Sequence, residues 1–232
     1  MVACTGYRKD IMGDSVQLIL ASGSQRRQQF FHALGLDFEV KVADIDETPY
    51  PEEKPDALTY RLAEEKAQAV AGTFTDGLNR LIIAADTVGG LGDEILGKPI
   101  DAQDAKRILI ALRGRPHQVY SGISILSTTT GEQHTHVNAT DVVMRMYTDA
   151  EIDAYIATGD PFDKAGAYAI QHPIFAPVQA LQGCPASVMG LPLADLQRLF
   201  AQFGVSILKD ISSVCEQHVD FPCCQRKNFE HG

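Results

Sequence analysis

Two adjacent arginines, Arg26 and Arg27, stand where a short apolar run gives way to a predicted helix in the stretch LILASGSQRRQQFFHALG. The first turn of a helix carries a partial positive charge from its unpaired N–H groups, so each guanidinium there is expected to cost about 0.3–1 kcal/mol. A bound anion would remove this conflict, because the backbone N–H groups, the hydroxyls of Ser22 and Ser24 and both guanidinium groups are together suited to a phosphate. The alternative is that Ser24 caps the helix and both arginines extend into water.

Carboxylates end two other predicted strands. Asp86, followed by Thr87, closes the apolar run RLIIAADTV, and ligands of open α/β sheets gather at the carboxyl ends of strands. A carboxylate there can hold a divalent cation or accept a proton from water, although it can also cap a turn. The segment DIDE places Asp44, Asp46 and Glu47 together, and such carboxylates repel one another unless a cation or a proton relieves them. A solvated charge run is the alternative for this segment.

Two further segments hold polar residues beside glycine, proline or other small residues. Lys98 lies between Gly97 and Pro99, and Lys164 and Gln171 flank the small-residue run of DKAGAYAIQ. A single lysine or glutamine is more often simply solvated. Taken together, the segments supply cations for phosphates, carboxylates for a metal and an amide that could read the edge of a base.

The elements that must position these residues follow from hydrophobic periodicity and from helix start and stop signals, and they indicate an α/β domain with a mixed sheet. Thr148 and Glu151 form a predicted capping box at one helix start. We expect strands at 16–21, from residue 38, at 80–88 and, as several strands, at 117–147; helices at 25–34, 56–72, 101–114, 148–159 and 191–204; and a hairpin or loop at 89–100.

The periodic pattern predicts three parts of the chain. Residues 1–15 are expected to form a flexible N-terminal arm, residues 16–206 the folded domain and residues 207–232 a disordered C-terminal tail. The tail contains Cys215, His218, Cys223 and Cys224, but adjacent cysteines are awkward joint zinc ligands, so a disordered tail is favoured over a metal site. Cys184 is expected to be a small, semi-buried thiol.

Composition excludes several classes of function. The chain has 232 residues and a formal net charge of −10, which argues against broad binding to nucleic acid or to an anionic membrane surface. No apolar run approaches the roughly 18–20 residues needed to span a bilayer. Five cysteines are few and odd in number, which fits a reduced, cytoplasmic location better than a disulfide scaffold.

The order of these motifs resembles the Maf nucleoside triphosphate pyrophosphatases. The similarity covers about residues 16–204, and DPFDKAGAYAIQ is its most specific segment. The resemblance implies an elongated, two-lobed α/β fold, similar to inosine triphosphate pyrophosphatases, with a central mixed sheet, flanking helices and a cleft between the lobes. The matching segments are ASGSQRR (21–27), DIDE (44–47), AEEKA (63–67), AADT (84–87), ILGKP (95–99), LRGRPHQVYSG (112–122), EIDAYIATGDPFDKAGAYAIQ (151–171) and VMGLPL (188–193).

The resemblance also implies an activity: hydrolysis of a nucleoside triphosphate between its α and β phosphates, with Mg²⁺ or Mn²⁺ as cofactor. Asp86 matches the catalytic aspartate, a proton acceptor and metal ligand, and Glu47 matches its acidic partner, expected to share the metal. The positions that match the substrate-binding residues of the family are Ser22, Ser24, Arg26, Arg27, Lys66 and Lys98.

The resemblance extends to the choice of base. Thr87, Arg26 and Gln171 look like the subgroup that favours dTTP and UTP, with modified pyrimidine nucleotides as further candidates; the other subgroup, selective for 7-methyl-GTP, is the alternative. A nucleotide-binding regulator of septum formation is a second alternative. Members of the family often form dimers, so a homodimer is a candidate assembly. Gly89 and Gly90 depart from the family pattern, and the strand there is expected to end early.

Overall fold

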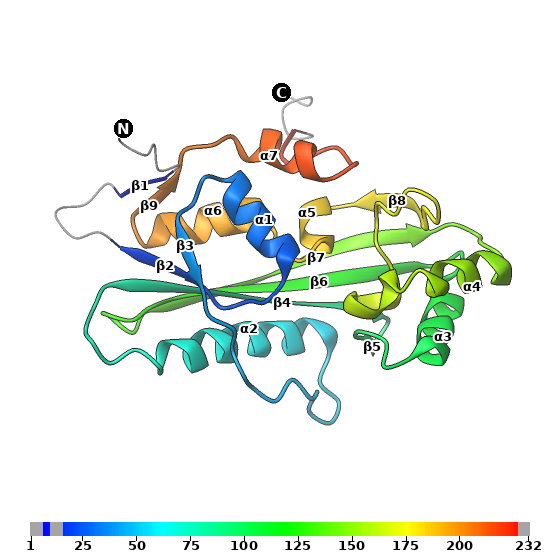
Figure 1. Ribbon diagram of the computed structural model, residues 1–232, viewed down its shortest axis with the longest axis horizontal. Helices are drawn as coiled ribbons and strands as arrows, with labels where there is room; N and C mark the ends of the chain where they lie inside the picture. Colours follow the sequence, from blue (N-terminus) through cyan, green and yellow to red (C-terminus); the bar gives the residue numbers. More distant parts are fainter. Residues whose placement is uncertain (1–6, 10–15, 227–232) are drawn as a thin grey trace.

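A seven-stranded mixed sheet organises the computed structural model, which describes residues 7–9 and 16–226 (Figure 1). Strands β2 and β3 are parallel to each other and β2 is parallel to β4, whereas the remaining pairs are antiparallel. The strand order is β3-β2-β4-β6-β7-β8, and β5 pairs with β4. The strands are β2 (Gln17–Leu20), β3 (Phe38–Val40), β4 (Arg80–Leu91), β5 (Glu94–Leu96), β6 (Pro116–Ser127), β7 (Gln133–Met144) and β8 (Val178–Gln182).

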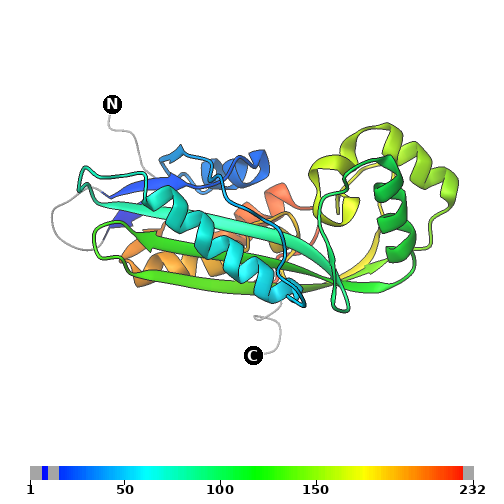
Figure 2. The same ribbon diagram turned by 90° about the horizontal axis from the view of Figure 1, so that it is seen from below.

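Helices cover both faces of the sheet and one end of it. Helix α2 lies along one face, while α1, α5, α6 and α7 lie over the other (Figure 1). Helices α3 and α4 gather at the far end of an elongated molecule (Figure 2), which confirms the expected two-lobed mixed α/β architecture. The helices are α1 (Gln25–Ala33), α2 (Pro55–Ala71), α3 (Ala102–Leu112), α4 (Asp149–Ala157), α5 (Pro185–Val188), α6 (Leu193–Gln202) and α7 (Ile211–His218), with short 3-10 turns η1 (Asp160–Asp163) and η2 (Ala165–Ala167).

Local signals in the sequence set several of these helix ends. The predicted capping box of α4 is confirmed, because Thr148 Oγ1 accepts from the Glu151 N–H at 3.2 Å and Glu151 Oε2 accepts from the Thr148 N–H at 2.7 Å. Asp101 caps α3 by accepting from the Asp104 N–H at 2.8 Å.

Among the described residues, no helix has the length and apolar character needed to cross a membrane.

Close packing of α2 against the middle of the sheet depends on Gly122 in β6. Gly122 pairs with Asp86 of β4, and a Cβ added at Gly122 would overlap the backbone carbonyl of Thr59 in α2. Thr59 is fully buried, so this backbone cannot move aside into solvent. The bare glycine therefore lets α2 pack closely on β6 at the position that pairs with Asp86.

We expect Gly122→Ala to destabilise the fold by about 1–3 kcal/mol or more, because a methyl group would be forced into a filled contact between helix and sheet. Urea unfolding followed by circular dichroism measures this loss. Gly72→Ala is the matched control, since a Cβ at Gly72 makes only ordinary van der Waals contacts on ordinary helical backbone. Equal stability of the two variants would contradict the close approach.

Strand β4 is longer than the sequence predicted. The expectation that it ends early at Gly89 and Gly90 was wrong, because β5 pairs with Gly89 to Leu91 on one side and β6 continues on the other. The glycines are needed where they stand, since a Cβ at Gly90 would lie 2.9 Å from the Tyr120 ring and 3.0 Å from Pro55. By contrast, the strand predicted from Phe38 is only three residues long, and the following acidic segment is irregular.

Both terminal segments contain regular structure, unlike the flexible N-terminal arm and the disordered C-terminal tail that the sequence predicted. Helix α7 begins at an Asp210 cap and buries Ile211, Val214 and Cys215 against the core, and Cys223 is buried beyond it. A disordered tail was therefore wrong for residues 207–226, while residues 227–232 lie outside the described part. At the other terminus β1 (Tyr7–Lys9) pairs with β9 (Val205–Ile207), and the rest of the expected arm, 1–6 and 10–15, is outside the described residues.

Candidate active site

A cavity of about 1020 Å³ opens beyond the carboxyl end of β2, between α1, β4, α2 and the segment around η1 and η2. The residues that the sequence singled out converge on it from distant parts of the chain. Its lining includes every predicted catalytic and substrate-binding residue: Ser22, Ser24, Arg26, Arg27, Glu47, Lys66, Asp86, Thr87, Lys98 and Gln171.

Asp86 lies in the middle of β4 rather than at its carboxyl end. Strand β2 ends at Leu20, opposite Ile83, and β4 continues beyond it between β5 and β6. Asp86 therefore stands beside the point where its parallel neighbour β2 has ended. The ligand site at the carboxyl end of a strand is thus provided by β2 and is reached by a side chain from β4.

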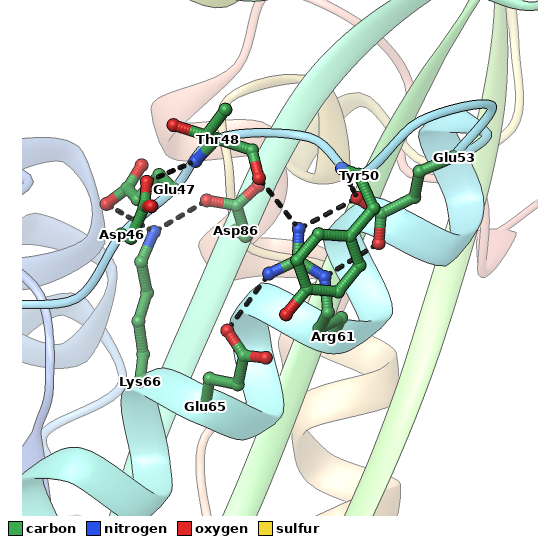
Figure 3. A network of polar contacts seen from close by, with 9 residues as sticks. All are labelled: Asp46, Glu47, Thr48, Tyr50, Glu53, Arg61, Glu65, Lys66 and Asp86. Atoms are coloured by element: carbon green, nitrogen blue, oxygen red, sulfur yellow. Dashed lines mark hydrogen bonds and ion pairs between the residues drawn. The ribbon is translucent and has the colours of Figure 1, made fainter.

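A buried lysine joins the two predicted catalytic carboxylates (Figure 3). Lys66 Nζ lies 2.7 Å from Asp86 Oδ1 and 2.9 Å from Glu47 Oε1. The Lys66 and Asp86 side chains are about nine-tenths buried, whereas the Glu47 side chain is 57% exposed at the cavity mouth. Attraction to the shared ammonium offsets the repulsion between the two carboxylates.

One oxygen of this group has no protein partner among the described residues. Asp86 Oδ2 is buried and has no hydrogen-bond partner among the described residues, and such an oxygen normally requires one. Hard carboxylate oxygens suit Mg²⁺ or Mn²⁺, so Asp86 and the exposed Glu47 fit the predicted cofactor. The described residues contain no group of three or more acidic, histidine or cysteine ligands, so water and substrate oxygens would complete the coordination.

The two adjacent arginines at the start of α1 have different surroundings. Arg27 is partly buried, and its guanidinium donates to the Gly190 carbonyl at 2.8 Å, to Ser22 Oγ at 3.1 Å and to Thr87 Oγ1 at 3.2 Å. Burial lowers the pKa of Arg27 from its ordinary value, and the nearby Asp86 carboxylate opposes that shift. Arg27 therefore ties together the loop after β2, strand β4 and the loop before α6.

Arg26 is also partly buried, with 31% of its side chain exposed, and lies at the cavity wall. Its Nη2 is 3.7 Å from Asp163 Oδ2, and this contact joins α1 to η1 across the cavity. Ser24 occupies the cap position of α1, but its side chain makes no capping hydrogen bond. The alternative of a capped helix with both arginines in water is thus wrong, and the N-terminus of α1 opens onto the cavity.

The remaining predicted residues lie at the periphery. Lys98 is exposed, and no partner for its ammonium is found in the described part of the chain. Gln171 is exposed at the rim of the cavity, next to the buried Ile170. Lys164 also lines the cavity but is already paired, since its Nζ lies 2.8 Å from Asp160 Oδ1 and 2.6 Å from Asp163 Oδ1.

Sequence reasoning missed the residues that support this site from behind. The fully buried Ser121 shares a 2.7 Å hydrogen bond with Thr87 and donates to the Ser187 carbonyl, and Gly190 supplies a backbone acceptor to Arg27. Ser121 and Gly190 fall inside the motifs VYSG and VMGLPL. The signal that could have identified Ser121 is that it is a polar residue within an apolar strand pattern. Asp163, the partner of Arg26, had no signal beyond its place in DPFDKAG.

The fold and the site define a two-lobed α/β protein whose cleft brings carboxylates and cations together. The chain belongs to the Maf family: the family described as Maf-like protein matches residues 17–203. This match omits the C-terminal segment that contains α7.

Three curated relatives that match most of the chain are each named dTTP/UTP pyrophosphatase. That from Desulforamulus reducens is 40% identical over 191 residues, 82% of this chain and 98% of the relative. Those from Anaeromyxobacter dehalogenans and Acetivibrio thermocellus are 44% and 42% identical, over 81% and 84% of this chain and 94% and 100% of the relatives. A solved nucleoside-triphosphatase/dITP/XTP pyrophosphatase from Mycobacterium abscessus is 13% identical with a TM-score of 0.36, covering 55% of this chain and 74% of that one.

Proposed function

We propose that the protein is a nucleoside triphosphate pyrophosphatase that hydrolyses dTTP and UTP between the α and β phosphates, releasing the monophosphate and pyrophosphate. Such an enzyme would remove unwanted nucleotides, including modified pyrimidine nucleotides, from the cellular pool. The observation that carries the proposal is the convergence on one cavity of Asp86 and Glu47, bridged by Lys66, with the cations Arg26 and Lys98. The names of the relatives supply the substrate class.

Different residues of the cavity would have different roles in the reaction. Asp86 would hold the metal through its unpaired Oδ2 or accept a proton from the attacking water, and Glu47 would share the metal. When bound, Mg²⁺ or Mn²⁺ supplies Lewis-acid stabilisation of phosphate oxygens. Charge accumulates on pyrophosphate as its bond to the α phosphorus breaks, and preplaced cations stabilise that charge without reorganising.

The base is expected at the rim of the cavity. Gln171 is exposed there, and its amide can donate and accept a hydrogen bond at once, as the edge of uracil or thymine requires. The buried Ile170 and the partly buried Met189 provide apolar surface nearby. These residues support a pyrimidine preference.

A substrate panel tests the proposal. Purified protein with Mg²⁺ or Mn²⁺ is offered normal and modified nucleoside triphosphates, including 7-methyl-GTP, and the products are separated by ion-exchange chromatography. We expect UMP and pyrophosphate from UTP, with UTP and dTTP turned over fastest. Release of UDP and phosphate would contradict cleavage between the α and β phosphates, and a preference for 7-methyl-GTP would contradict the choice of base.

We expect Arg26→Ala and Lys98→Ala each to lower turnover of UTP by about 10²-fold or more, the size of effect seen when one preorganised electrostatic stabiliser is removed. The loss should fall on kcat more than on KM, because charge on the leaving group develops only in the transition state. Arg107→Ala and Lys106→Ala on α3 are matched controls outside the cavity. Steady-state kinetics with pyrophosphate detection measures both constants, and near-normal kcat in both variants would contradict the proposed role.

Location and assembly extend the proposal. We propose a cytoplasmic enzyme, which the four free cysteines of the described residues support, because thiols stay reduced in that compartment. A homodimer remains a prediction, and sedimentation of the purified protein tests it. The net charge of −10 supports the expectation that the protein binds neither nucleic acid nor an anionic membrane.

A further inference from the structure

The loop between β3 and α2 carries Glu47 but has no regular structure of its own. Residues 41–50 form neither helix nor strand, and the Glu47 side chain is more than half exposed. Its one ion pair among the described residues is the contact with Lys66. Another part of the molecule must therefore hold this loop in place if Glu47 is to remain opposite Asp86.

Arg61 on α2 provides that attachment (Figure 3). Its Nε and Nη2 each lie 2.7 Å from an oxygen of Glu53, and its Nη2 also donates to the Thr48 carbonyl at 3.2 Å. Its Nη1 donates to Glu65 Oε2 at 3.0 Å, which fixes the guanidinium on the helix. The Tyr50 ring covers the guanidinium at 3.9 Å. The Arg61 side chain thus contacts the loop at Thr48, Tyr50 and Glu53.

The contacts of Arg61 with the loop are expected to be stable, because they are shielded from water. The Arg61 and Glu53 side chains are only 15% and 8% exposed, so the bidentate pair is largely shielded from water. Hydrogen bonds from Arg61 lower the pKa of Glu53 from its usual value, which keeps the carboxylate charged. The loop adds two bonds of its own, from the Thr48 N–H to Asp46 Oδ1 and from the Tyr50 N–H to Glu53 Oε2, both 2.9 Å.

We infer that Arg61 is a positioning residue for the reaction, which holds the loop so that Glu47 faces Asp86 across Lys66. Thr48, whose carbonyl Arg61 binds, directly follows Glu47 in the chain, and Lys66 lies on the same helix as Arg61. Arg61 does not line the cavity, so it acts through Glu47 and not on the substrate. The inference rests on the proposed function for its catalytic consequence, but the restraint on the loop is independent of it.

The matched control is Arg80 at the start of β4. Arg80 also makes a bidentate pair, with Asp76, and its guanidinium also lies over a ring, that of Phe74 at 4.2 Å. The Arg80 side chain is more buried than that of Arg61, whereas its partner Asp76 is half exposed, and the pair holds the loop after α2, away from the cavity. Arg61→Lys and Arg80→Lys each keep the charge and remove the planar fork.

Hydrogen exchange measured by mass spectrometry tests the restraint without reference to activity. We expect Arg61→Lys to raise exchange in residues 44–53, because a loop that loses its anchor opens locally at lower free energy. Arg80→Lys should leave these residues unchanged and raise exchange around residues 72–79. Unchanged exchange in 44–53 of Arg61→Lys would overturn the inference, whatever the activity of the protein.

Kinetics with Mn²⁺ tests the catalytic consequence. We expect Arg61→Lys to lower kcat for UTP by about 10-fold to 100-fold and to raise the Mn²⁺ concentration needed for half-maximal activity, as loss of a supporting residue behind a metal ligand does. KM for UTP should change little, and Arg80→Lys should match the wild type. An unchanged Mn²⁺ requirement in an active wild type and variant would overturn the positioning role, whereas a wild type without pyrophosphatase activity would overturn only the proposed function.

Discussion

Asp86→Asn is expected to lower the turnover of UTP by about 10³-fold or more while leaving the protein folded. The substitution keeps the shape of the side chain but removes the charge that Lys66 neutralises at 2.7 Å and the oxygen that has no protein partner. A lost general base alone costs about 10²–10⁴-fold, and loss of a metal ligand acts in the same direction. Single-turnover kinetics with pyrophosphate detection measures the effect.

Asp195→Asn is the matched control for this variant. Asp195 is as buried as Asp86 and is bonded to Asn138 and Arg198, but it lies outside the cavity. We expect its kcat to match that of the wild type. A variant Asp86→Asn that keeps more than a tenth of wild-type turnover would contradict the assignment of Asp86.

Lys66→Met is expected to damage both stability and catalysis. Removing the ammonium leaves the nine-tenths buried Asp86 carboxylate facing Glu47 without its ion-pair partner, and breaking a buried pair in this way costs about 3–5 kcal/mol. Because Glu47 is exposed to solvent, which screens its repulsion of Asp86, we expect the loss of stability to lie near the lower end of that range. Turnover should fall by about 10²–10³-fold, because a preplaced cation is removed from the cavity.

The double variant Lys66→Met/Asp86→Asn separates the buried charge from other causes of instability. If the uncompensated carboxylate is responsible, the double variant should be more stable than Lys66→Met alone, since no unpaired charge remains. Urea unfolding of both variants and the wild type gives the comparison. Additive destabilisation by the two substitutions would contradict a direct Lys66–Asp86 pair.

The local parts of the fold could be predicted because their causes are local. The capping box of Thr148 and Glu151 and the helix beginning at Gln25 depend on residues a few positions apart. The length of β4 could not be predicted, because Gly89 and Gly90 are strand residues only when β5 and β6 pair with them and Tyr120 needs the space. The order of α7 likewise depends on packing against the distant core.

The candidate site could likewise be predicted only in part. Residue types and spacing indicated cations for phosphates and carboxylates for a metal, the family resemblance added Lys66 and the triphosphate, and the fold brings these side chains to one cavity. The residue types did not indicate that the Arg27 guanidinium is fully engaged in hydrogen bonds to Gly190, Ser22 and Thr87. Arg26, by contrast, lies at the wall of the cavity. Adjacent residues on a helix point about 100° apart, so a pair of arginines cannot be expected to share one environment.

Anomalous diffraction from crystals grown with Mn²⁺ and α,β-methylene-dTTP tests the central claim most directly, because this analogue cannot be cleaved between its α and β phosphates. We predict a manganese peak at the Asp86 and Glu47 carboxylates, with the phosphates between the N-terminus of α1 and the side chains of Arg26 and Lys98. A triphosphate bound on another face of the protein, or manganese bound away from Asp86, would contradict it.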